Sequence, residues 1–207
     1  NNCLPYNVIC TAESQAILNY NNATPRSTVS DWVTPEYTSL NRNPYREWIG
    51  AQIRADGWGY GCAGNPELAA EFAYRDACWT HRANGIYGEM MFAAIIAAAF
   101  SVDDPVDLIN IGLSEIPENC KLAEASRRAL SEMDQTKDFY KYMDWVEAEF
   151  GELSGVHTVN NALVVIGALF YGKSDFHQSV CYAIEGGWDT DCNGATCGSI
   201  LGAIHGR

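Results

Sequence analysis

The sequence contains few basic residues. Thirteen lysines and arginines stand against 26 aspartates and glutamates, which gives a formal net charge of −13 over 207 residues. Binding along a nucleic-acid backbone requires a basic surface that releases counterions from the phosphates. The composition therefore argues against a nucleic-acid partner. It indicates little more, because an acidic surface mainly favours solubility.

Long hydrophobic runs are also absent. The longest strongly apolar stretch, MMFAAIIAAAF, covers only residues 90–100. A helix that crosses a bilayer needs about 20 consecutive apolar residues. We therefore predict that this stretch is a buried helix, and we expect no membrane partner. No secretory signal is visible in the sequence either.

The cysteine pattern excludes a small disulfide scaffold. The eight cysteines are sparse for a chain of this length, and no CxxC pair occurs. We therefore expect reduced thiols in a cytoplasmic protein. A zinc site from His177, Cys181, Cys192 and Cys197 is an alternative, since the first two lie four residues apart on a predicted helix. The spacing matches no standard zinc pattern, which argues against it.

Strand patterns of convincing length are missing, and helical patterns dominate after Trp48. We expect residues 1–50 to be an irregular connecting segment with one helix at about residues 8–20. Residues 51–207 are expected to form one all-α domain, a compact orthogonal helical bundle. Capping residues, glycines and prolines predict helices at about 66–81, 84–102, from 105, from 117, 134–150, 156–171, from a Ser174 cap to 186, and from 193 onward.

The most informative stretch is GGWDTDCNGATCGSILG, which covers residues 186–202. Two carboxylates, Asp189 and Asp191, follow a glycine pair and precede a helix made of small residues. Carboxylates are hard oxygen ligands that suit Mg²⁺ or Mn²⁺, and a helix start presents free N–H groups. The stretch therefore indicates a metal- and phosphate-binding corner. The alternative is that one aspartate, or Asn193, only caps the last helix, which is worth about 1 kcal/mol.

Part of this stretch resembles the C-terminal metal motif of the ADP-ribosylglycohydrolase family. Three upstream segments are similar to further family patterns and occur in the family's order, so that the resemblance covers about residues 45–205. The four segments are GWDTDCNGAT at 187–196, WIGAQIRAD at 48–56, Thr80-His81 with NGIYGE at 84–89, and HTVNNA at 157–162.

The resemblance implies an all-α fold of the ADP-ribosylglycohydrolase type that holds a binuclear Mg²⁺ or Mn²⁺ centre. It also implies hydrolysis of the glycosidic bond between ADP-ribose and a protein or small-molecule acceptor, through an oxocarbenium-like transition state. The catalytic residues implied are Asp189, Asp191 and Glu89, and the metal ligands are Asp189, Asp191 and Cys192. The residues implied for ADP-ribose are Gln52, Arg54, Asp56, His81, Asn84, Gly85, Tyr87 and Trp188.

For several of these residues, a role in stabilising the fold is an alternative to a role in the site. His81 suits the C-terminal cap of its helix, and Glu89 suits the first turn of the next, where it would stabilise the helix dipole. Arg54 suits pyrophosphate, but an internal salt bridge with Asp56 is equally consistent. Aromatic packing in the core explains Tyr87 and Trp188 as well. Cys192 stands where many family members have a metal-binding threonine, and a thiol matches Mg²⁺ poorly.

The family also carries a Thr-Asp-Asp metal motif near its N-terminus, which this sequence lacks. Its adjacent pair, Asp103-Asp104, precedes a proline and is interpreted as a turn and a helix cap. We therefore expect the second half of the metal site to come from an N-terminal segment or a companion chain. The alternatives to hydrolysis of ADP-ribosyl bonds are a non-catalytic ADP-ribose or nucleotide binder, a crystallin-like structural protein, or a hydrolase of small glycosylated metabolites.

Overall fold

The computed structural model describes residues 34–206. The described residues form ten α-helices and a 3₁₀ helix, and their only strand-like pairing is an isolated bridge between Trp48 and His157. The predicted all-α class is therefore confirmed. The helices are α3 (Pro35–Leu40), η2 (Gln52–Arg54), α4 (Asp56–Gly61), α5 (Pro66–Ala77), α6 (Asn84–Ala98), α7 (Pro105–Ser114), α8 (Lys121–Gln135), α9 (Phe139–Phe150), α10 (Thr158–Gly172), α11 (Phe176–Glu185) and α12 (Thr190–His205).

Capping side chains explain why the helices begin where the sequence predicts. Asn65 accepts a hydrogen bond from the Leu68 amide at the start of α5, and a proline follows it. Asp104 accepts hydrogen bonds from the amides of Val106 and Asp107, which confirms the predicted turn and cap before α7. The helix expected at about 8–20 lies outside the described residues.

Four predicted helix starts differ from the structure. The helix predicted at 134–150 begins at Phe139, because Asp138 provides its N-terminal cap. The helix predicted from residue 117 begins at Lys121, because Cys120 provides the N-terminal cap. Asp175, not Ser174, caps α11, and its carboxylate accepts a hydrogen bond from the Gln178 amide at 2.7 Å. The last helix begins at residue 190, three residues earlier than predicted, because Asp189 caps it.

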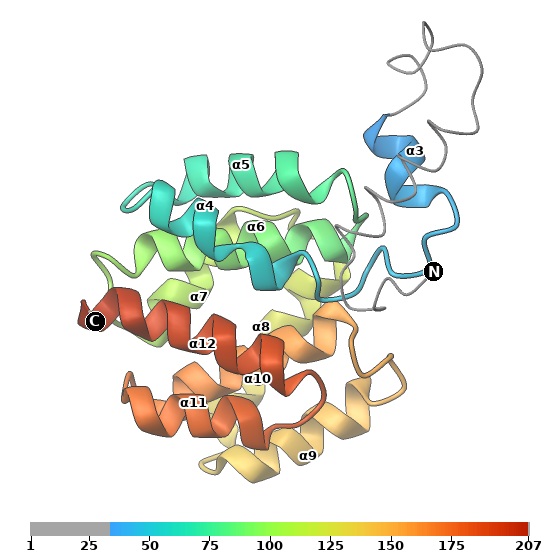
Figure 1. Ribbon diagram of the computed structural model, residues 1–207. Coiled ribbons are helices and arrows are strands. Elements are labelled where there is room, and N and C mark those ends of the chain that lie inside the picture. The colour runs from blue at the N-terminus through green and yellow to red at the C-terminus, as the bar shows by residue number, and fades with distance from the viewer. Residues whose placement is uncertain (1–33, 207) are drawn as a thin grey trace, which may run out of the picture.

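Two almost fully buried helices form the centre of the bundle. The stretch predicted to be a buried helix lies largely in α6, and α10 is buried to a similar extent. Figure 1 shows α4 and α5 on one side of this centre and α9 and α11 on the other. Gly167 allows close packing between α10 and α9, since a Cβ there would collide with the Tyr142 ring. The Tyr142 hydroxyl donates to the Leu163 carbonyl at 3.0 Å.

The chain before η2 joins the starts of the two central helices. The short helix α3, which the sequence analysis does not predict, lies in this part of the chain (Figure 1). The Ile49 amide donates to the Val156 carbonyl at 2.9 Å, and the Thr158 amide donates to the Glu47 carbonyl at 3.0 Å. Gly85 lets α6 approach the same segment, because a Cβ there would lie 2.5 Å from the carbonyl oxygen of Arg46.

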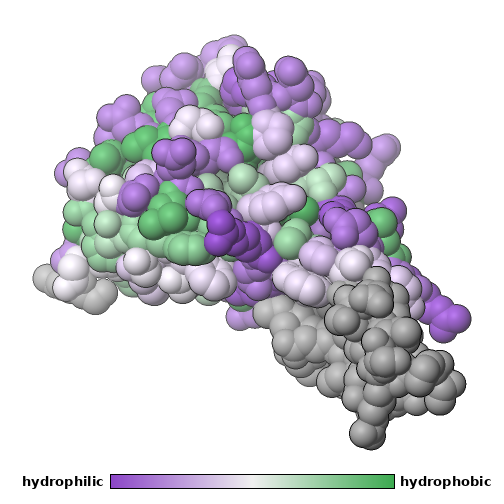
Figure 2. Space-filling view, turned by 90° about the horizontal axis from the view of Figure 1, so that it is seen from above, coloured by the Kyte–Doolittle hydropathy of each residue, from purple (hydrophilic) through white to green (hydrophobic). Residues whose placement is uncertain are grey.

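The surface is mixed in character. In Figure 2, which views the molecule from above, hydrophobic residues reach the surface in patches between hydrophilic ones. Within residues 34–206, we find no helix with the length and apolar character needed to cross a membrane.

Candidate functional site

Asp189, Asp191 and Cys192 lie together at the start of α12, and we call this cluster the acidic corner. The ligand atoms of Asp189, Asp191 and Cys192 all lie within 4.8 Å of one another. They follow a tight turn in which Gly187 has φ +80° and Trp188 has φ +51°. Glycine adopts this conformation without strain, whereas a bulky residue rarely does. The turn brings the chain from α11 directly into α12 and places both carboxylates at the helix N-terminus.

Asp189 is the helix cap that the sequence analysis offers as an alternative to a ligand. Its Oδ1 accepts a hydrogen bond from the Cys192 amide at 3.3 Å. A carboxylate has two oxygens with about four acceptor positions, so capping with Oδ1 does not prevent metal binding. Asp191 is exposed in the first turn, where the helix dipole stabilises its charge. The cap and the ligand roles are therefore compatible.

Asn161 of α10 fixes the backbone of this corner. Its Oδ1 accepts hydrogen bonds from the Asp189 amide at 3.0 Å and from Nδ2 of Asn193 at 2.9 Å. Its own Nδ2 donates to the carbonyls of Gly155 and His157. The sequence analysis assigns Asn161 no site role. The available signal is an amide within a very apolar helix, because such a group is stable there only when it is hydrogen-bonded.

Cys192 differs from the two aspartates in its environment. The residue is only 7% exposed, and this burial, together with the neighbouring aspartates, raises the pKa of its thiol. A neutral thiol is a poor ligand for a hard cation such as Mg²⁺. The donor set therefore fits a hard divalent cation through the two carboxylates better than through the buried thiol.

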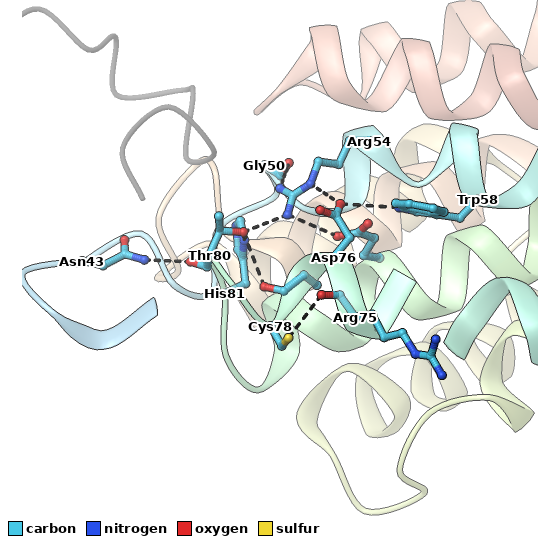
Figure 3. A network of polar contacts seen from close by, with 11 residues as sticks. Asn43, Gly50, Arg54, Trp58, Arg75, Asp76, Cys78, Thr80 and His81 are labelled. Carbon is cyan, nitrogen blue, oxygen red and sulfur yellow. Dashed lines mark hydrogen bonds and ion pairs between the residues drawn. The ribbon is translucent and has the colours of Figure 1, made fainter. Parts of the chain in front are cut away.

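A second polar cluster surrounds Arg54 (Figure 3). Its Nε lies 2.5 Å from Oδ2 of Asp76, and its two other nitrogens donate to the Gly50 carbonyl at 3.1 Å and to Oγ1 of Thr80 at 2.8 Å. Oε2 of Glu89 lies 3.6 Å away. The alternative of a salt bridge with Asp56 is wrong, because the partner of Arg54 is Asp76. This guanidinium is engaged within the fold.

Glu89 lies in the interior of the protein. It is not in the first turn of α6, so it does not have the helix-dipole role that the sequence analysis offers as an alternative. Its side chain has no exposed surface, and neither carboxylate oxygen has a hydrogen-bond partner. Burial is the main cause that raises its pKa well above the usual value, against the opposing effect of Arg54. The nearby Asp76 raises it further. Burial therefore favours the protonated form of the Glu89 carboxyl over the charged form.

His81 is the third buried titratable group of this cluster. Its Nδ1 lies 2.7 Å from Oγ1 of Thr80, and its Nε2 has no partner. Burial, followed by the charge of Arg54, lowers its pKa to about 3, so the ring is neutral. Because α5 ends at Ala77, the His81 side chain is not the C-terminal cap of this helix, which the sequence analysis offers as an alternative role.

Two of the other predicted residues, Gln52 and Asp56, lie close to the buried face of α12 and α6. Gln52 is fully buried, and its side-chain amide has no hydrogen-bond partner. Oδ2 of Asp56 accepts a hydrogen bond from Oγ of Ser199 at 2.6 Å, which links α4 to α12. Burial raises the pKa of Asp56, with this hydrogen bond opposing it. Both residues retain free hydrogen-bonding capacity.

Other predicted residues serve the packing of the fold. Nδ2 of Asn84 donates to Glu47 at 2.7 Å, and its Oδ1 accepts from the Leu122 amide at 3.0 Å. Tyr87 and Trp188 pack against the hydrophobic core, which agrees with their structural alternative. Asn84 thus joins three segments of the chain, and its side-chain oxygen and nitrogen are both used within the fold.

Two surface hollows lie away from both clusters. Their volumes are about 500 and 980 Å³, and they share Lys173 and Ser174 at the end of α10. His205, near the C-terminal end of α12, lines the larger one, whereas the acidic corner lies at the N-terminal end of that helix. None of the residues implied for catalysis, for ADP-ribose or for Mg²⁺ lines these hollows, although His177 of the alternative zinc site lines the larger one.

Comparison with known proteins identifies the family. The chain matches the family described as ADP-ribosylglycohydrolase over residues 6–207, which extends the similarity well before the 45–205 estimated from motifs. Searches of curated proteins and of solved structures give no match. The all-α fold agrees with the family match, and the match covers nearly the whole chain. The chain belongs to the ADP-ribosylglycohydrolase family.

Proposed function

We propose that this protein is a metal-dependent hydrolase that cleaves the glycosidic bond between ADP-ribose and a protein or small-molecule acceptor. The observation that carries the proposal is the pair Asp189 and Asp191. Their ligand atoms lie within 4.8 Å of each other at a helix N-terminus, and the backbone beneath them is anchored to α10. The family to which the chain belongs supports the reaction class.

In this proposal Asp189 and Asp191 hold Mg²⁺ or Mn²⁺. When bound, such a cation activates water and stabilises charge on the oxygens of the substrate. The two carboxylates supply the hard oxygen ligands that these ions prefer. We propose that the second half of a binuclear centre comes from a segment or companion chain outside the described residues.

The buried cluster has a separate role in the proposal. Burial raises the pKa of Glu89, and a carboxylic acid with a raised pKa suits proton donation to a leaving group. Arg54 and His81 fix the charge around this acid: the guanidinium lies 3.6 Å away, and the imidazole stays neutral. Asn84 and Gly85 fix the start of the helix that carries Glu89.

A non-catalytic ADP-ribose or nucleotide binder, or a crystallin-like structural protein, is the second candidate. One observation favours it: two residues expected to bind ADP-ribose, Arg54 and Asn84, use their polar groups within the fold. The buried thiol of Cys192 also occupies a position where a hydroxyl would suit the metal better. Metal-dependent turnover separates the two candidates.

The test is the release of ADP-ribose from an ADP-ribosylated protein with and without Mn²⁺, for the wild type and Asp189→Asn. Asparagine caps a helix as well as aspartate does, so this variant removes a charged ligand but keeps the cap. We expect it to lose at least 100-fold in activity, since even outer-shell changes at metal sites cost about 10–100-fold.

Asp175→Asn is the matched control, because Asp175 caps α11 in the same way and lies outside the corner. We expect it to retain wild-type activity. Wild-type turnover by Asp189→Asn would exclude the proposed metal site. Binding of ADP-ribose without any release by the wild type would instead favour the non-catalytic candidate.

A further inference from the structure

Asn161 has an unusual number of side-chain hydrogen bonds for a residue inside an apolar helix. It is the fourth residue of α10 and has no exposed surface. Its Oδ1 accepts two hydrogen bonds and its Nδ2 donates two, all four at 3.0 Å or less, so the amide is fully satisfied; Nδ2 also makes a longer contact of 3.5 Å to Oδ1 of Asn160. Only a side chain with one acceptor and two donors fits this arrangement.

The four hydrogen bonds join two loops that are distant in sequence. Nδ2 holds the carbonyls of Gly155 and His157 in the loop before α10. Oδ1 holds the backbone of Asp189 at 3.0 Å and the side chain of Asn193 at 2.9 Å in the loop and first turn of α12. Figure 1 shows both loops at the same end of the bundle. The backbone position of Asp189 is thereby set by a different helix.

We propose that Asn161 is a positioning residue that sets the metal affinity of Asp189 and Asp191 by holding the backbone from which these carboxylates extend. This inference rests on the proposed function. The mechanism is preorganisation: a metal ion binds tightly when its ligands already stand in position, and partners outside the ligand shell supply that order. Without Asn161, the turn must be ordered when the metal binds, which weakens the affinity.

Asn160 provides a matched control in the adjacent position. It is equally buried, and its Nδ2 donates to the Ser154 carbonyl at 3.2 Å. Its Oδ1 accepts from the backbone amide of Asn161 at 3.2 Å and lies 3.5 Å from Nδ2 of Asn161, which already donates two shorter hydrogen bonds. Among the described residues, its side-chain hydrogen bonds stay within the loop before α10 and the first turn of that helix. Asn160→Ala therefore removes a buried amide without removing a contact to the acidic corner.

The experiment compares Mn²⁺ affinity, by titration with electron paramagnetic resonance, for the wild type, Asn161→Ala and Asn160→Ala. Hydrogen exchange of the Asp189 amide is measured on the same samples. We expect Asn161→Ala to raise the Mn²⁺ dissociation constant about 10–100-fold and to accelerate that exchange. Asn160→Ala should lower the melting temperature about as much as Asn161→Ala does. Its Mn²⁺ dissociation constant should change by less than about threefold.

Asn193→Ala gives an independent measurement if Asn161→Ala does not fold, because it removes one of the two hydrogen bonds to Oδ1. We expect an increase in the dissociation constant of a few fold. Unchanged affinity in Asn161→Ala, or in Asn193→Ala where that variant stands in, would overturn the inference, as would an equal loss in Asn160→Ala. If the wild type binds no Mn²⁺, the proposed function itself fails, and this inference fails with it.

Discussion

Two polar clusters in this molecule use the same residue types in opposite ways. Around Arg54, the carboxylates of Asp76 and Glu89 point to a cation that the chain itself supplies, and Glu89 is fully buried. At the start of α12, Asp189 and Asp191 lie close together, and no ion pair neutralises either of them within residues 34–206. In the first cluster the chain supplies the cation itself, whereas in the second the two carboxylates have no cation from the described residues.

The difference between the two clusters indicates that the Arg54 cluster stabilises the fold, whereas the acidic corner is arranged to bind a cation. Two like charges about 4 Å apart repel each other by about 1 kcal/mol even in water. The fold accepts this cost at the corner, because the Asn161 amide and the Asp189 cap keep the backbone fixed. We therefore expect mutations in the Arg54 cluster to change stability and mutations in the acidic corner to change metal binding.

The largest effect on stability is expected from Arg54→Met. The change leaves Asp76 without its cation and removes the hydrogen bonds to the Gly50 carbonyl and to Thr80, and each buried polar group left without a partner costs about 1–3 kcal/mol. Urea denaturation measures the loss in the free energy of unfolding. Arg75→Met is the control, since the Arg75 pair with Glu71 is exposed and worth less than about 1 kcal/mol. Equal losses in both variants would contradict the assignment of Arg54 to the fold.

The next effect is a pH dependence in which two buried groups oppose each other. The pKa of His81 is lowered to about 3 from 6.5, so the unfolded chain binds more protons and stability is lost as the pH falls from 6.5. The pKa of Glu89 is raised from 4.5, so the folded protein binds more protons and stability is lost as the pH rises above 4.5. Each group contributes at most about 1.4 kcal/mol per pH unit.

Single substitutions separate these two contributions between pH 4.5 and 6.5. In Glu89→Gln the histidine contribution is unopposed, so the free energy of unfolding should rise with pH more steeply than in the wild type. In His81→Gln the free energy of unfolding should rise less steeply with pH than in the wild type, or fall. Urea denaturation at several pH values in this range measures both slopes. Parallel profiles for the wild type and both variants would show that these groups ionise in the folded state as they do in the unfolded chain.

Much of the fold could be predicted because its signals are local. Asn65 and Asp104 each precede a proline and cap the helix that follows, and the long apolar run before residue 100 can only be buried. The starts of α8 and α11 were harder to predict, since the competing caps lie within a few residues of one another. The capping role of Asp189 was one of several alternatives that the sequence could not separate.

The candidate site was predictable only where its residues are neighbours in sequence. Asp189 and Asp191 form a compact motif, so the sequence indicates them directly. Asp76 and Asn161 were missed because their partners lie 22 and 28 residues away, and only the packing of helices brings them together. The alternative pairing of Arg54 with Asp56 fails for a geometric reason, since residues two apart on a helical turn do not face each other.

The smallest effect on stability, and the sharpest contrast with Arg54, is expected from Asp191→Asn. Asp191 is exposed and is not the helix cap, so the free energy of unfolding should change by less than about 0.5 kcal/mol, with relief of the repulsion from Asp189 offsetting a weaker interaction with the helix dipole. The Mn²⁺ affinity, measured in the same sample, should nevertheless fall by more than tenfold. A variant that binds Mn²⁺ normally, or that loses several kcal/mol of stability, would show that the acidic corner serves the fold as the Arg54 cluster does.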